Sequence, residues 1–375
     1  MKVIYGLAGT GKSTYMASLI RAETRSFVVL AATHSAVENI YRIVGTVDRR
    51  KFMTLYSYFR IDYINNMIRG VPPAQVVSVI YIDEFSLINK HLFRRCLMKV
   101  PRSDVVLCGD PLQLNAIYDT EESITFAELK ALQDLPIPAI QHYHLSIFGL
   151  KEVSKAEKVK LTEIKRSEDA VLRLFNAIFV DGNKEYDGFK FVTFDEMVHL
   201  VHTDDYVLLA SKYARLQEVY DELAEVDNRF DVHIEQRNEK GFKRLHFYKG
   251  MELMMIETTE DYYNGQRVYF DSVLDGNNSI YVLTEARGLL KVVKDNIIPV
   301  TPSNLLTVHK AQGMTIPKII VNLDDMFDPC MLYTAITRAK TDVLFYTKES
   351  DKVKKLFDSA CIDVFHELRR KVYGF

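Results

Sequence analysis

The sequence lacks several features that mark specialised classes of protein. Four cysteines occur in 375 residues, and no two have the spacing of a zinc site or a disulfide framework. We therefore expect inert thiols in a reducing compartment. No apolar run reaches the roughly 18 residues needed to span a bilayer, and no charged leader precedes the first strand pattern. A soluble, cytoplasmic protein is expected.

A strong net charge is also missing. The chain has 48 Lys and Arg against 50 Asp and Glu, a formal charge of -2. This balance excludes a globally basic nucleic-acid binder, so any basic track must be local. No internal repeat or low-complexity tract occurs either. With 375 residues, 48% of them hydrophobic, the chain is predicted to form more than one core.

The first part of the chain has the pattern of a parallel α/β domain. Residues 2–5 read as a strand, followed by a Gly-rich turn, a helix over 12–21 and an apolar strand over 27–32. Further apolar runs at 76–82 and 105–108 supply two more strands. We predict an α/β core over residues 1–145.

A second α/β block begins near residue 146. Strands are expected at 206–210, 318–323 and 342–346, and helices at 170–179 and 214–226.

Between 230 and 300, short alternating segments are separated by the hairpin-turn signals Asn264-Gly265 and Asp275-Gly276-Asn277-Asn278. We predict a second core over 146–229 and 301–375, with a β-rich insert over 230–300.

One glycine-rich motif predicts nucleotide binding. Residues 6–13 fit G-x-x-x-x-G-K-[ST] between the first strand and the first helix. Such a loop turns backbone N–H groups toward phosphate at a helix N-terminus, while Lys12 reaches the β- and γ-phosphates and Ser13 binds Mg²⁺. ATP and Mg²⁺ are the expected ligands. The nucleotide-binding set is Gly6, Ala8, Gly9, Thr10, Gly11, Lys12, Ser13 and Thr14.

An acidic pair follows the apolar strand that ends near residue 82. Because the carboxyl end of a strand in an open α/β sheet faces the ligand crevice, we expect Asp83 to hold Mg²⁺ and Glu84 to activate the attacking water. Together with the phosphate loop, the pair predicts NTP hydrolysis. It does not indicate what the hydrolysis drives.

Three later motifs resemble those of superfamily 1 helicases. Residues 109–114 (GDPLQL) resemble motif III, residues 308–315 (VHKAQGMT) motif V, and residues 332–340 (LYTAITRAK) motif VI. The resemblance implies that Gln113 senses the γ-phosphate and that Gly313 adjoins the nucleotide. It also gives two arginines to the phosphoryl transition state, Arg338 in motif VI and Arg166 in motif IV, where a guanidinium can offset the developing charge.

Within this superfamily, LTEIKRS at 161–167 and the motif V segment resemble the Dda-like helicases of tailed phages, relatives of the RecD-like branch. The resemblance implies two RecA-like cores, an SH3-like insert, a phage or other viral source, and 5′-to-3′ movement on single-stranded DNA. It also implies nucleic-acid contacts by Thr33, His34, Thr54, Tyr56, His309 and Lys310. From the residues alone, Thr33 reads equally well as a helix N-cap, and Tyr56 as a core aromatic.

Two departures from that family affect the expected activity. Only five residues precede the phosphate loop, so the upstream glutamine that reads adenine is expected to be absent and other NTPs to be accepted. Any strand-separating pin must be compressed into about residues 61–74. A reduced pin predicts a translocase that unwinds duplexes poorly.

Several alternatives remain open at this stage. A viral RNA helicase shares the same motifs, so RNA could replace DNA as the track. A P-loop phosphotransferase shares the phosphate loop but does not explain motifs V and VI. A non-catalytic nucleic-acid-binding module conflicts with the intact Lys12, Asp83 and Arg338. A replication or single-strand-binding protein is a candidate partner of the motor.

Overall fold

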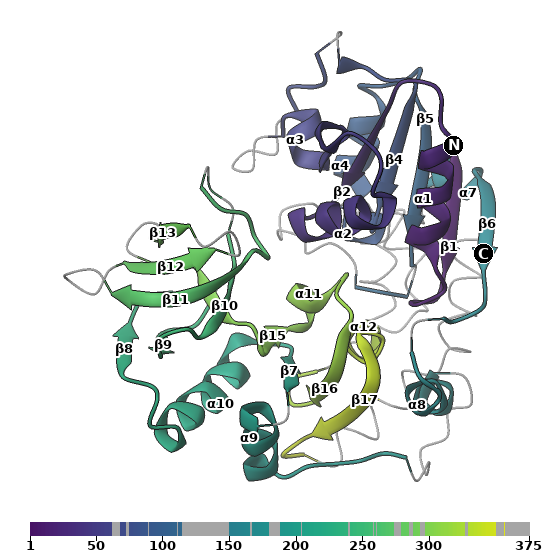
Figure 1. Cartoon of the computed structure of the whole chain (residues 1–375). Coiled ribbons are helices and arrows are strands. Elements are labelled where there is room, and N and C mark those ends of the chain that lie inside the picture. Colours follow the sequence, from purple (N-terminus) through teal and green to yellow (C-terminus); the bar gives the residue numbers. More distant parts are fainter. Residues whose placement is uncertain are drawn as a thin grey trace, which may run out of the picture. The chain divides into compact units, whose positions relative to one another are not determined.

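Two sheets of parallel strands organise the chain, one in each of two units (Figure 1). The units lie within Met1–Arg166 and within Ser167–Ala360. The computed structural model describes residues 1–61, 68–72, 75–88, 90–110, 112–114, 150–165, 167–179, 188–203, 205–238, 241–257, 259, 261–273, 279–284, 288–292, 297–326, 329–349 and 356.

The first unit contains a six-stranded parallel sheet in the order β3-β2-β4-β5-β1-β6. Its strands are β1 (Lys2–Gly6), β2 (Phe27–Ala31), β3 (Phe52–Thr54), β4 (Val79–Asp83), β5 (Asp104–Gly109) and β6 (Glu157–Leu161). Every described residue of β2 and β4 is buried, as expected for inner strands covered on both faces.

Helices cover both faces of this sheet. On one face, Ile4 and Val29 pack with α1 (Lys12–Ala22) and α2 (His34–Val44), which Figure 1 shows in front of the strands. On the other face, Leu30 packs with α3 (Leu55–Phe59) and α4 (Lys90–Leu97). The other helical segments among the described residues of this unit are α7 (Lys151–Ser154) and the 3-10 turns η1 (Arg49–Lys51) and η3 (Phe85–Leu87).

Strand β6 belongs to the first sheet. The expected start of the second core near residue 146 would put this strand in that core, and this boundary is wrong. The structure instead pairs Glu157 to Leu161 in parallel with Lys2 to Gly6 of β1. A sheet contact between strands this distant in sequence leaves no local signal, since β6 is a half-exposed edge strand with a mixed pattern.

The second unit contains a four-stranded parallel sheet in the order β15-β7-β16-β17. Its strands are β7 (Tyr206–Ala210), β15 (Leu305–Thr307), β16 (Ile316–Asn322) and β17 (Ala339–Tyr346), and its helices are α8 (Asp169–Phe179), α9 (Phe194–Thr203), α10 (Tyr213–Val226), α11 (Val308–Ala311) and α12 (Pro329–Ile336). Helices α9 and α10 pack against β7 in one core cluster. The two parallel sheets confirm the predicted α/β fold.

A β-rich insert interrupts the second sheet. An antiparallel sheet in the order β13-β12-β11-β10-β14 lies beside the two-stranded ribbon of β8 and β9. The strands are β8 (Val232–Glu235), β9 (Arg244–Phe247), β10 (Glu252–Met255), β11 (Arg267–Val273), β12 (Ile280–Thr284), β13 (Leu289–Val292) and β14 (Val300–Pro302). Only Ser303 and Asn304 separate β14 from β15, and Thr301 Oγ1 donates to the Leu305 carbonyl oxygen at 2.9 Å.

Several predicted features lie partly or wholly outside the described residues. The predicted pin over 61–74 lies mostly outside them, although Ile61 and Ile68 form an antiparallel bridge. The Asp275–Asn278 turn and Cys361 also lie outside. Cys96, Cys108 and Cys330 are buried and unbridged. Among the described helices, none has the length and apolar character required to cross a membrane.

The buried centre of the first sheet predicts a large cost of truncation at Leu30, which is 0% exposed. We expect Leu30→Ala to lower the free energy of unfolding by about 2–5 kcal/mol, because it removes buried methyl groups and leaves a cavity. The shift of the urea midpoint measures the change. Val76→Ala, at an exposed apolar side chain, is the control and should shift it little. Equal shifts for the two variants would contradict the assigned core.

Candidate active site and nucleic-acid interface

The phosphate loop joins the end of β1 to the start of α1. A Cβ on Gly6 would lie 2.2 Å from the carbonyl oxygen of Leu161 on β6, so only glycine fits there. Gly11 has φ 81°, in the left-handed region that favours glycine. No side chain caps the N-terminus of α1. The N–H groups of its first turn are therefore available to an anion.

The Lys12 ammonium lies across the loop that precedes it. Its Nζ donates to the carbonyl oxygens of Gly6 at 3.0 Å and Leu7 at 2.9 Å. Thr10 Oγ1 also donates to Leu7 O, at 2.8 Å. These contacts hold the cation over the cradle of backbone amides, where the sequence predicts a phosphate.

Ser13 and Asp83 meet at the end of β4. Ser13 Oγ donates to Asp83 Oδ2 at 3.0 Å, across 70 residues of sequence. Hydroxyl and carboxylate oxygens suit Mg²⁺, which commonly uses one or two protein ligands and completes its shell with water and phosphate. No group of three or more His, Cys, Asp or Glu suited to a metal occurs among the residues that the structure describes. The Ser13–Asp83 pair fits Mg²⁺ on donor chemistry.

Burial is the main cause of an unusual carboxyl at this site. Asp83 is 2% exposed, and burial, followed by the charge of Glu84, raises its pKa to about 6. Ser13 and Cys108 donate hydrogen bonds to Asp83 and partly offset the rise. Burial, followed by the Asp83 charge, raises the pKa of the Cys108 thiol well above its usual value. Sequence reasoning missed Cys108, which lies beside Asp83 only because β4 and β5 pair.

Glu84 has a backbone conformation that is rare for its residue type. Its φ is 48°, in the left-handed region, and its N–H donates to Asp83 Oδ1 at 3.0 Å. Non-glycine residues held in this region are strained and cluster at functional sites. The geometry turns the chain sharply between β4 and η3, directly after Asp83.

A buried turn follows β5 at the same edge of the sheet. Asp110 and Gln113 are 0% and 2% exposed. Leu112 N donates to Asp110 Oδ1 at 2.9 Å, and Gln113 N donates to Asp110 O at 3.3 Å. Because β1, β4 and β5 are parallel neighbours, Lys12, Asp83, Glu84 and Gln113 all follow strand ends on one edge.

A hollow beside the phosphate loop contains residues that the sequence analysis did not select. Besides the predicted Gly9, Thr10, Gly11 and Thr14, it is lined by Tyr15, Ser18, Leu161 and Lys165. Lys165 N donates to Gly9 O at 2.8 Å, so the segment after β6 is fixed to the loop. A phosphate-loop motif does not extend to Tyr15 or Lys165, and only the position of β6 brings the latter here.

Of the two arginines expected at the γ-phosphate, Arg338 is among the described residues and Arg166 is not. Arg338 lies two residues after the end of α12 at Ile336. Its Nε donates to Thr334 O at 3.0 Å, its Nη1 to Met314 O at 3.3 Å and its Nη2 to Thr337 Oγ1 at 3.1 Å. The guanidinium is therefore bonded within the second unit. Arg166 lies outside the described residues.

The candidate track residues of the first unit are helix caps or partly buried. Thr33 Oγ1 accepts from Ala36 N at 3.2 Å, which confirms the N-cap interpretation. Thr54 Oγ1 accepts from Ser57 N at 3.1 Å in the same way. Burial, followed by the Arg49 charge, lowers the pKa of His34. Tyr56 is half-buried and packs against the core.

The motif V residues lie on and after α11 in the second unit. Lys310 Nζ donates to Ile256 O at 3.1 Å and to Asn264 Oδ1 at 3.3 Å, both in the insert. Burial lowers the pKa of His309. Gly313 has φ 84° directly after this turn. The motif thus contacts the insert through Lys310.

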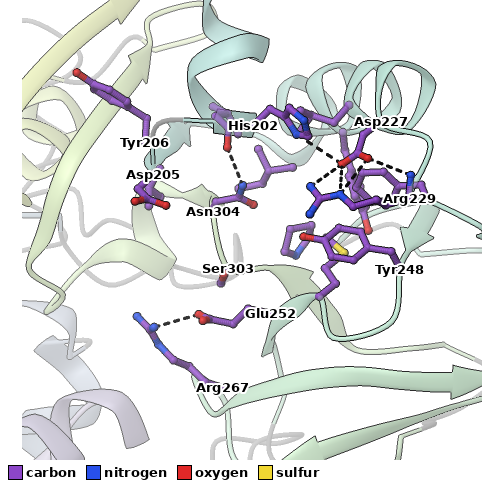
Figure 2. Close-up of a pocket in the computed structure, with 18 residues that line it drawn as sticks. His202, Asp205, Tyr206, Asp227, Arg229, Tyr248, Glu252, Arg267, Ser303 and Asn304 are labelled. Carbon is purple, nitrogen blue, oxygen red and sulfur yellow. Dashed lines mark hydrogen bonds and ion pairs between the residues drawn. The ribbon is translucent and has the colours of Figure 1, made fainter.

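A second pocket, which the sequence analysis did not predict, lies at the amino ends of β7 and β15 (Figure 2). Asp227 forms an ion pair with Arg229 at 2.7 Å, and its carboxylate lies 3.5 Å from His202 Nδ1. The Arg229 guanidinium lies 4.5 Å from the Tyr248 ring centroid. Nearby, Glu252 pairs with Arg267 at 3.0 Å. Figure 2 shows these charges paired with one another around the pocket wall.

Two family models match separate parts of the chain. One described as an AAA domain matches residues 1–134, and one described as the viral superfamily 1 RNA helicase core domain matches residues 222–347. The first covers the phosphate loop and the acidic pair, and the second covers the insert and motifs V and VI.

Known proteins align over nearly the whole chain. The ATP-dependent DNA helicase Pif1 of Campylobacter jejuni is 21% identical over 406 residues, covering 89% of this chain and 85% of that protein. A structure of two coordinating Pif1 helicases at forked double-stranded DNA has TM-score 0.65 and 22% identity, covering 99% of this chain and 92% of that one. Bacteroides Pif1 bound to single-stranded DNA has TM-score 0.62 and 22% identity, covering 98% and 92%. The chain has the fold of these solved structures.

The raised pKa of Asp83 predicts that its charge destabilises the ligand-free protein. Because the folded pKa of about 6 exceeds the ordinary value of 3.8, the protonated carboxyl favours folding below pH 4, and this contribution is lost as the pH rises through 6. We expect Asp83→Asn to raise the free energy of unfolding at pH 7.5 by on the order of 3 kcal/mol.

Chemical denaturation at pH 4 and pH 7.5 measures the effect, which should shrink at the lower pH. Asp195→Asn, at an exposed position on α9, is the control. A destabilised Asp83→Asn at pH 7.5 would contradict the cause assigned to the shift.

Proposed function

We propose that this chain is an ATP-dependent superfamily 1 DNA helicase, similar to Pif1, that moves on single-stranded DNA. The observation that supports it most is the convergence of Lys12, Ser13, Asp83, Glu84 and Gln113 on one edge of a parallel sheet. A second parallel-sheet unit carrying motifs V and VI separates this arrangement from a simple P-loop enzyme. The full-length likeness to Pif1 structures supports the same function.

The proposed chemistry is hydrolysis of the γ-phosphate. Lys12 exchanges its contacts with Gly6 O and Leu7 O for phosphate oxygens, and Ser13 with Asp83 holds Mg²⁺. The Mg²⁺ held there would supply positive charge that offsets the charge of the phosphates. Glu84 accepts a proton from the attacking water, and Gln113 contacts the γ-phosphate. Arg338 and Arg166 are the proposed cations for the transition state.

The hollow beside the phosphate loop is the proposed binding site of the nucleoside. Tyr15 offers an aromatic ring, while Ser18 and Lys165 offer polar groups. A site built from one ring and a few donors favours stacking over reading the edge of the base. We therefore propose that NTPs other than ATP are also hydrolysed.

Nucleic-acid contacts are proposed in each of the two units. Thr33, His34, Thr54 and Tyr56 are the candidate contacts in the first, and His309 is the candidate in the second. The motif resemblance supports four finer proposals: a Dda-like lineage, a viral origin, 5′-to-3′ movement and an SH3-like insert. It also supports a replication or single-strand-binding protein as partner. A cytoplasmic location is proposed from the cysteine usage and from the lack of a long apolar run.

One observation favours a second candidate, an RNA helicase. The family model that matches residues 222–347 is described as a viral superfamily 1 RNA helicase core. Recognition of the track through backbone phosphate and stacking does not by itself distinguish DNA from RNA, which differ at the 2′-hydroxyl. Measuring ATP hydrolysis with each polymer separates the DNA track from the RNA track.

The rate of ATP hydrolysis without polymer, with single-stranded DNA and with single-stranded RNA tests the proposal. We expect strong stimulation by DNA and a drop in kcat of about 10²-fold or more in Lys12→Ala, which loses the charge at the phosphates. Stimulation by RNA alone would establish the RNA helicase. A rate indifferent to both polymers would exclude the motor and favour a phosphotransferase.

Glu84→Gln separates nucleotide binding from hydrolysis. The variant keeps the backbone and side-chain length but cannot accept a proton, so kcat should fall by about 10²- to 10⁴-fold. Binding of a fluorescent ATP analogue with Mg²⁺ should stay near the wild-type affinity. A variant that retains wild-type turnover would remove Glu84 from the proposed chemistry.

A further inference from the structure

The loop between β10 and β11 is closed by its own hydrogen bonds. Gly265 N donates to Met255 O at 2.8 Å, and Met255 N donates to Gln266 O at 2.9 Å. Gln266 N also donates to Tyr263 O at 3.0 Å. The described part of this loop, residues 256–266 with 258 and 260 excepted, therefore has a defined conformation.

Lys310 joins both ends of that loop to motif V. Its Nζ donates to Ile256 O, at the start of the loop, and to Asn264 Oδ1, near its end. Lys310 belongs to α11, which directly follows β15 of the core sheet. One ammonium thus connects the insert and the core within a single unit.

An acidic side chain of the loop favours a cation at this position. The segment 256–266 reads IETTEDYYNGQ, with three acids and no Lys or Arg. The Glu257 carboxylate acts on Lys310 and opposes the effect of burial, which lowers the pKa of Lys310 to about 8. A half-buried ammonium that uses two of its three N–H groups on the loop is poorly disposed to bind a phosphate as well.

We infer that Lys310 is a positioning residue that fastens the acidic β10–β11 loop to motif V, and that it does not bind the phosphates of the track. This role rests on the proposed helicase function and replaces the track contact that the motif resemblance assigned to Lys310. The loop then stays beside α11 when the track is bound. Releasing it would let three acids move near a polyanion.

The salt dependence of DNA binding distinguishes the two roles. One phosphate contact contributes about 0.7 to the slope of log affinity against log salt for a single strand. For Lys310→Gln we expect an unchanged slope, measured by anisotropy of a labelled oligonucleotide between low and moderate salt. Lys318→Gln, whose Nζ lies 5.3 Å from the Tyr206 ring centroid, is the matched lysine control. A slope reduced by about 0.7 in Lys310→Gln alone would overturn the inference.

A double-mutant cycle with Asn264→Ala tests the connection itself. We expect each single variant to lower the DNA-stimulated kcat by about threefold to tenfold, with the basal rate unchanged, and the double variant to be no worse than Lys310→Gln. Losses of kcat that add in the double variant would overturn the inference. So would an Asn264→Ala variant with the wild-type kcat. A role confined to holding the fold together would instead lower the thermal midpoint and both rates alike. If Lys310→Gln does not fold, Asn264→Ala tests the inference through the DNA-stimulated kcat and the salt dependence of DNA binding.

Hydrogen exchange tests the connection without any polymer. Lys310→Gln should speed exchange at the Gly265 amide, which donates to Met255 O, and Lys318→Gln should not. Unchanged exchange would overturn the connection even if the motor is confirmed. Conversely, faster exchange in Lys310→Gln, together with a wild-type ATPase rate that ignores both polymers, would refute the helicase function and leave the connection standing.

Discussion

Parallel pairing of β1 with β5 on one side and β6 on the other is the constraint on which the nucleotide site depends. The register sets Tyr5 beside Gly109 and Gly6 beside Leu161, so three strands end at one edge. Gly6 permits the close approach of the Leu161 carbonyl, and the chain turns there into the phosphate loop. The acidic residues after β4 reach the same edge because β4 pairs with β5.

The local parts of the site could be predicted from the sequence, because a phosphate loop and the acids after a strand carry their geometry in a few adjacent residues. The bond between Ser13 and Asp83 follows from that local pattern once the strands are parallel. The fold class followed from alternating apolar runs and helical periods. The position of β6, the contact of Cys108 with Asp83 and the contacts of Lys310 could not be predicted, since each depends on segments far apart in sequence.

The site also holds groups in states that do not favour folding. Asp83 is a carboxyl buried beside a second acid, and Glu84 has a left-handed backbone. Both are unfavourable in the ligand-free protein. Both can contribute to binding when a polyanion and a cation occupy the edge of the sheet. The uncapped start of α1 has the same character, because its free N–H groups need an anion as partner. Ligand-free stability and ligand affinity are therefore opposed at these positions.

The insert and the core sheet are joined in series by covalent backbone. Strand β14 pairs with β10 in the insert, and two residues later the same chain enters β15, which leads directly into α11. Because the link has only two residues, it leaves little backbone freedom between the insert's sheet and β15. The position of β14 in the insert therefore constrains the position of motif V through two residues of backbone and the strand β15.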